Sequence, residues 1–330
     1  MISLDLVGLL VLADVSAVSE RTALTGNAFL ADALVLCPGM HRQQYEPADL
    51  SGGEFPATAA MTTGYVFRIE NSGTVFFLQR VSRTGQLTTL KVTRDADAVG
   101  RLLRSTIATA AYLGAILLTV AIITLAILTQ DWWGFLVICI LVVARLLNVL
   151  LIRRRSKPGW SGVSEPGQKG DLIILLSHDR WVRMRGAVDD LKAVTSGRWL
   201  RDLTGLETAV AHLATLLVYF GAVLAANMTL FSQGLFVLLV IGSVGLVHLA
   251  NMTIKVLHMH GNTIALDGAR KSYRRRLDLA HELIQETGRH DWALKLGMVK
   301  KDDIPETSQG QKREGYQNSA SDASSEAVVM

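Results

Sequence analysis

The chain has 330 residues, 50% of them hydrophobic and 19% charged, and its formal net charge at pH 7 is only +4. The small charge and the lack of interleaved basic and aromatic residues argue against nucleic acid as a partner, and two cysteines are too few for a disulfide framework. The composition favours a protein embedded in a membrane in its middle and exposed to water at both ends.

Residues 1–104 predict a cytosolic domain that contains β-strands. The apolar run at 6–13 has acidic residues on both sides and no Lys or Arg before it, so it makes a poor signal peptide. With about eight residues it is also too short to span a bilayer, and we expect a buried strand or helix. The alternation over residues 64–93, with turns at 71–73 and 84–85, predicts a three-stranded meander.

Four stretches in the middle of the chain are apolar and almost free of charge. Residues 105–130 carry no charge, and no charged side chain follows Glu207 until Lys255. Because about 20 apolar residues span a hydrocarbon core, the sequence predicts an α-helical integral membrane protein with four transmembrane helices in two hairpins. We expect the first hairpin at 105–152 (helices 105–129 and 132–152, turn at 130–131) and the second at 208–254 (helices 208–231 and 234–254, turn at 232–233).

The basic residues give the expected orientation. Nine Lys and Arg precede the first hairpin, eleven lie between the hairpins and twelve follow the second, whereas both turns have none. Cytoplasmic loops collect Lys and Arg, so both termini and the linker are expected in the cytosol of a cell whose plasma membrane or an endomembrane holds the protein. Trp132 and Trp133 lie where an interfacial aromatic belt is expected.

Residues 153–207 form the predicted cytosolic linker, with two short strands around 178–179 and a short helix near 189–200. We expect this β-rich piece and the one in residues 1–104 to form one small α+β domain on the cytosolic face.

Residues 255–301 predict a basic amphipathic cytosolic helix, clearest at 264–287, and residues 302–330 predict a disordered tail. Each basic residue near an anionic membrane surface contributes about 1 kcal/mol to membrane binding. For the basic residues of the helix at 255–301, the alternative is a helix end exposed to solvent. The expected contacts with lipid headgroups are Arg153, Arg154, Arg155, Lys157, Arg270, Lys271, Arg274, Arg275 and Arg276.

Arg145 is the one basic residue inside a predicted span, about 5 Å from its midpoint. No Asp or Glu lies in any span to neutralise it, so its partners are expected to be polar side chains, backbone carbonyls or a lipid phosphate. Structural hydrogen bonds are the favoured role, and an anionic ligand is the alternative. The predicted intramembrane polar cluster consists of Arg145, Asn148, His248, Asn251 and His212.

The sequence carries no motif for catalysis. It lacks HExxH, GxSxG, a Walker loop and a dinucleotide glycine fingerprint, so we predict neither catalytic residues nor a cofactor. His258 and His260, with His248 upstream, raise the possibility of a metal site, but residues two apart diverge on a helix, and we predict none.

Residues 179–200, which read DRWVRMRGAVDDLKAVTSGRWL, resemble a stretch of uncharacterised multispanning membrane proteins of filamentous fungi. The resemblance extends weakly over the meander and the hairpins. It implies a fungal source and a membrane location, and it brings no substrate, cofactor or functional residue with it.

The sequence favours a non-enzymatic membrane anchor or adaptor with cytosolic interaction surfaces. Its expected partners are anionic lipids, a cytosolic protein and further copies of the chain. One alternative is a small transporter or channel subunit for a neutral or anionic solute near Arg145. A third is a membrane-bound enzyme that acts on a lipidic substrate.

Overall fold

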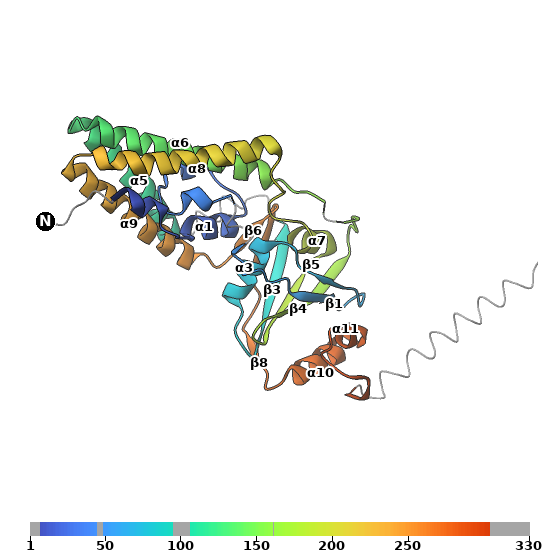
Figure 1. Ribbon diagram of the computed structural model, residues 1–330. Coiled ribbons are helices and arrows are strands. Elements are labelled where there is room, and N and C mark those ends of the chain that lie inside the picture. Colours follow the sequence, from blue (N-terminus) through green and yellow to red (C-terminus); the bar gives the residue numbers. More distant parts are fainter. Residues whose placement is uncertain (1–6, 45–48, 95–105, 161, 304–330) are drawn as a thin grey trace, which may run out of the picture.

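The computed structural model describes residues 7–44, 49–94, 106–160 and 162–303. Long helices form a bundle, and a mixed β-sheet lies at one end of it (Figure 1). The long helices are α5 (Thr106–Leu128), α6 (Trp132–Arg155), α8 (Gly205–Leu224) and α9 (Leu230–Thr253). All four are long and apolar enough to cross a membrane, as the sequence predicts.

Tight turns join these helices in two hairpins. The first turn lies at the predicted place, between Leu128 and Trp132. The second lies four residues earlier than predicted, because η4 (Ala225–Asn227) ends the preceding helix and the Thr229 side chain caps α9 by accepting a hydrogen bond from the Ser232 N–H. Polar capping, which the apolar pattern does not reveal, therefore fixes this turn.

The helices pack mainly across the hairpins, α5 along α9 and α6 along α8. Residues 7–44, here called the N-terminal segment, lie against both pairs and share three buried apolar clusters with them. The segment contains η1 (Val7–Leu12), α1 (Ala17–Thr25), η2 (Leu30–Leu34) and η3 (Met40–Arg42).

The prediction that residues 1–104 form one β-containing domain is therefore wrong for the N-terminal segment, which packs on the long helices instead of joining the sheet. Within the apolar run at 6–13, residues 7–12 form η1, where Val7 shares a buried cluster with Ala225 and Met228 beside the second turn. From there the chain runs towards the sheet, where the backbone of Gly26 touches that of His258.

The sheet gathers strands from three distant parts of the chain. Its order is β2-β1-β4-β5-β3-β7-β6, with β8 pairing to β3 as well; among the described strands, only β3 and β5 run parallel. One sheet thus unites the two predicted β-rich pieces, and the segment after α9 adds further strands. The strands are β1 (Ala57–Ala60), β2 (Val66–Arg68), β3 (Gln86–Arg94), β4 (Lys169–Leu176), β5 (Arg180–Ala187), β6 (Leu257–Met259), β7 (Asn262–Leu266) and β8 (Lys271–Ser272).

The predicted meander is only partly right, because its middle strand is the helix α3 (Ser72–Val81). Asn71, which reads as a turn residue, accepts a hydrogen bond from the Thr74 N–H and caps this helix. The β-branched and aromatic residues favour a strand locally, but as a helix they bury Phe77 and Leu78 against the sheet.

The predicted basic helix over 255–301 is also wrong in its first half. Residues 257–272 supply β6, β7 and β8, and only α10 (Arg276–Thr287) and the short α11 (Asp291–Lys295) are helical, before a final turn η5 (Lys301–Asp303). Gly268, with φ +81, breaks the helical pattern. Residues 304–330, most of the predicted disordered tail, lie outside the described residues.

Helices cover both faces of the sheet. Leu172, Ile174 and Leu176 of β4 point to the face covered by α3 and α7 (Val188–Thr195), whereas Ile173 packs with α10 and α11 on the other face. This alternation is the period of two expected of a strand buried on both faces.

Candidate functional site

Arg145 is enclosed by the N-terminal segment. Its side chain is 1% exposed; its Nε donates to the carbonyl oxygen of Asp32 at 3.1 Å, and a terminal nitrogen donates to Oε1 of Gln43. Each of these acceptors lies more than 100 residues from Arg145 in the sequence. The charge is thus held by the chain's own polar groups.

Two neighbouring residues of α6 extend this polar contact towards the sheet. Asn148 donates to the carbonyl of Met40 at 3.1 Å and accepts from the Gln44 side chain at 3.0 Å. The guanidinium of Arg155 donates to the Gln44 side chain at 2.9 Å. One face of the second half of α6 is therefore hydrogen-bonded to residues 40–44.

On the α5 side, Asp32 supplies the nearest carboxylate. Tyr112 donates its hydroxyl to the Asp32 carboxylate at 2.6 Å, and the guanidinium of Arg21 lies 3.9 Å from the centre of the Tyr112 ring. Arg21, Asp32 and Arg145 are all less than 10% exposed. Asp32 therefore lies between two buried cations. It supplies a carboxylate that the predicted spans, which contain no Asp or Glu, lack.

The predicted intramembrane cluster comes together only in part. Arg145 and Asn148 are neighbours on α6, but the Asn251 side chain, on α9, donates to the Ala17 carbonyl of α1 at 2.7 Å. His212 and His248 are exposed on the outer surface of the bundle. Both asparagines and Arg145 thus bind the N-terminal segment.

The sequence offers one signal for these missed partners. Between Arg21 and Arg42 the only charged side chain is Asp32, a charge density as low as that of the spans. This low charge density is unusual for a water-exposed domain. It does not, however, identify Gln43 or Gln44 as hydrogen-bond partners of α6.

The basic residues at the end of α6 have different surroundings. Arg154 forms an ion pair with Glu207 at 3.0 Å, and Arg155 is buried against Gln44. Arg153 donates to the Ala28 carbonyl at 3.2 Å, while its side chain, like that of Lys157, remains exposed.

The basic residues near β8 lie at the far end of the sheet from the bundle (Figure 1). Arg270 donates to the Val81 carbonyl, Lys271 pairs with Glu282, and Arg276 pairs with Asp179. Arg274 and Arg275 are exposed. β8 pairs with the start of β3, so these residues lie on the order of 25 Å from the helix-facing end of that strand, which runs from Gln86 to Arg94.

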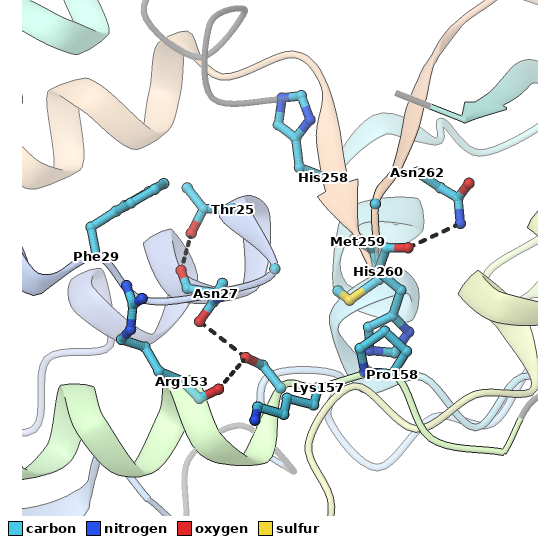
Figure 2. Close-up of a pocket in the computed structure, with 13 residues that line it drawn as sticks. Thr25, Asn27, Phe29, Arg153, Lys157, Pro158, His258, Met259, His260 and Asn262 are labelled. Carbon is cyan, nitrogen blue, oxygen red and sulfur yellow. Dashed lines mark hydrogen bonds between the residues drawn. The ribbon is translucent and has the colours of Figure 1, made fainter. Parts of the chain in front are cut away.

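A cavity of about 320 Å³ lies where the bundle meets the sheet. The loop after α1, the end of α6 and the turn between β6 and β7 form its walls (Figure 2). Gly26 holds the loop at the turn, because a Cβ at this position, whose φ is +68, would lie 2.2 Å from the His258 carbonyl oxygen. We call this space the junction cavity.

His258 and His260 both line the junction cavity, and Nδ1 of each ring faces a protein group. Nδ1 of His258 lies 3.3 Å from the Thr263 hydroxyl, and Nδ1 of His260 lies 3.1 Å from the Ala193 carbonyl. The described part of the chain holds no group of three His, Cys, Asp or Glu residues placed to bind a metal ion. His248 lies on the outer face of α9, apart from this pair.

Comparisons of this chain with protein-family models, with curated proteins and with solved structures found no match. The resemblance of residues 179–200 to fungal membrane proteins stays a prediction. The indications of function therefore come from the geometry of the described residues.

Proposed function

We propose that the protein is a membrane-embedded, non-enzymatic adaptor that holds its sheet domain at the membrane surface. The observation that carries the proposal is the enclosure of Arg145 by the N-terminal segment. A buried arginine that is bonded to its own chain favours one fixed arrangement of helices, because moving them apart would leave its charge without partners. The bundle is thereby suited to anchoring the sheet rather than to opening a path through the bilayer.

The outer surface of the bundle supports insertion in a bilayer. Large apolar side chains cover it, and Trp132 and Trp133 stand exposed at its turn end. Basic residues lie at the sheet end, and by the positive-inside rule this distribution supports a cytosolic position for the sheet. Val7, beside the second turn, would then lie towards the opposite face, unlike the cytosolic position that the sequence predicts for residues 1–104.

One strip of the N-terminal segment points to a partner within the membrane. Arg42 and Asp14 form an ion pair whose side chains are 44% and 66% exposed. The adjacent His41 carbonyl accepts a hydrogen bond from Thr215, about midway along α8. Because hydrocarbon penalises exposed charges at this depth, we propose that another protein chain, a second copy or a membrane partner, covers the strip.

The transport alternative requires donor groups on Arg145 that a solute can reach. Arg145 is 1% exposed and two of its nitrogens already donate to the N-terminal segment. We therefore expect reconstituted protein to show no flux of chloride or of a neutral sugar above that of protein-free vesicles. Flux that Arg145→Ala abolishes would favour the transporter over the adaptor.

Photo-crosslinking in native membranes tests the adaptor directly. A photoreactive amino acid at Ala13, exposed beside Asp14 of the strip, is expected to form a discrete protein adduct, and the mass of the adduct distinguishes a second copy from a different partner. The same probe at Leu117, 65% exposed on α5, serves as the lipid-facing control. Lipid adducts alone at both positions would contradict a covered strip.

A further inference from the structure

Two of the four basic residues at the end of α6 remain available for a ligand. Arg154 and Arg155 are engaged by Glu207 and Gln44, whereas Arg153 and Lys157 line the junction cavity. Within the described ranges, no carboxylate lies within ion-pair distance of Arg153 or Lys157, and the cavity has no Asp or Glu in its lining. Its charged lining is therefore entirely basic.

The other polar groups of the cavity fix its walls. The Asn27 side chain accepts from the Ser156 hydroxyl at 3.0 Å and from the Ala28 N–H at 2.8 Å, which ties the loop after α1 to the end of α6. Figure 2 shows Arg153 and Lys157 along the end of α6, across from the His258–Asn262 turn. The basic side chains are thus presented by a preformed frame.

The depth of the cavity matches the headgroup layer. Arg153 follows Trp132 by 21 positions in α6, a rise of about 31 Å at roughly 1.5 Å per residue. The hydrocarbon core is about 30 Å thick, so with Trp132 at one interface Arg153 lies at the other. Phe29 adds an apolar side chain to the lining.

We propose that the junction cavity binds the phosphate group of an anionic phospholipid. Arg153 and Lys157 donate to its oxygens, and the apolar lining beside Phe29 accommodates the start of the acyl region. A volume near 320 Å³ suits a headgroup rather than a whole lipid. The proposal rests on the membrane insertion proposed above, and it assigns the lipid a fixed place between the bundle and the sheet.

The test uses the full-length protein in nanodiscs of phosphatidylcholine, with or without phosphatidic acid or phosphatidylserine. Native mass spectrometry after release from the disc is expected to show one retained anionic lipid per chain. The paired change Arg153→Ala with Lys157→Ala should weaken retention on the order of tenfold or more. The matched control, Arg274→Ala with Arg275→Ala, removes the same charge from the far end of the sheet and should leave retention unchanged.

Each other outcome has a definite meaning. Equal loss in both double variants would overturn the proposal, since attraction would then be non-specific. If inorganic phosphate at millimolar concentration binds the cavity and no lipid is retained, the claim that the bound phosphate belongs to a phospholipid is contradicted. The ligand would then be a soluble phosphate. Flotation of each protein with vesicles reports insertion separately: wild type that fails to float contradicts the proposed function itself, whereas floating protein without retained lipid contradicts only the cavity's role.

Discussion

Gly8 is the point at which the N-terminal segment meets the backbone of α8. A Cβ built on Gly8 would lie 1.9 Å from the carbonyl oxygen of Ala222 and 3.0 Å from its Cα. Backbone atoms cannot move aside as the end of a flexible side chain can. Only glycine therefore allows this close approach.

Gly8→Ala should accordingly displace the N-terminal segment from α8 and reduce the free energy of unfolding by roughly 1–3 kcal/mol. The measurement is the thermal unfolding temperature of the protein in nanodiscs. Gly234→Ala in α9 is the control, because its Cβ would meet no atom within 4 Å; it is expected to be neutral or to stabilise by up to about 1 kcal/mol. Equal stability of the two variants would contradict the contact.

Asp131 links the two turns of the bundle. Its carboxylate accepts from the N–H of Gly134 at 3.1 Å and from the N–H and hydroxyl of Thr229 at 2.9 and 2.8 Å. Burial alone raises the pKa of Asp131, but the nearby Ser232 hydroxyl and the hydrogen bonds from Gly134 and Thr229 outweigh burial and lower its pKa from 3.8 to about 2. The ionised carboxylate thus stabilises the fold.

Asp131→Ala should reduce stability at neutral pH by about 1–2 kcal/mol, the usual effect of losing a cap. Since the folded pKa is the lower one, the stabilisation is present above the ordinary pKa of 3.8 and is lost as pH falls through about 2. Thermal unfolding of both proteins across this range should show their difference shrinking with acid. A constant difference would mean that the charge has no part in the link.

At the scale of elements, α10 is held to the sheet by apolar packing and by an ion network. Leu279 and Leu283 are buried against the sheet, and Arg183 of β5 donates to both Asp171 and Glu286. Hydrogen bonding to Arg183 lowers the pKa of Glu286. The ion network is therefore strongest at pH values at which Glu286 is ionised.

Arg183→Met should weaken the attachment of α10 by roughly 1–3 kcal/mol, because two carboxylates lose their shared donor. Hydrogen exchange in residues 276–287 is expected to accelerate at neutral pH. The effect should begin to fade as pH falls below the ordinary pKa of Glu286 and should vanish below its lower folded pKa, where the wild type also loses the ion pair. Arg185→Met, at a more exposed position with the same partners, should have a smaller effect.

The long helices and the β4–β5 pair could be predicted from the sequence because their signals are local: uninterrupted apolar runs and short alternating strands. The helix α3 could not, since its strand-forming residues are overridden by the Asn71 cap and by burial against the sheet. The partners of Arg145 could not be predicted either, because Asp32 and Gln43 meet it only through the fold.

At the scale of the whole molecule, the N-terminal segment joins the bundle to the sheet. Its η2 lies against α6 and α5, whereas its α1 packs on α9 and touches β6 and α3. Trp199, buried in the sheet's core, donates from its indole to the carbonyl of Gly26. The helical bundle and the sheet domain are thereby expected to move as one unit, as the proposed adaptor function requires.

Cross-linking within a single chain tests the central claim, that the N-terminal segment lies among the long helices. Cys37 shares a buried cluster with Ala115 of α5, whereas Leu117 points outwards. In a Cys139→Ser background, Ala115→Cys is expected to form a disulfide or a short bis-thiol cross-link with Cys37 in nanodiscs, and Leu117→Cys is not. Failure at position 115, or equal cross-linking at 117, would place the segment outside the bundle and contradict this arrangement.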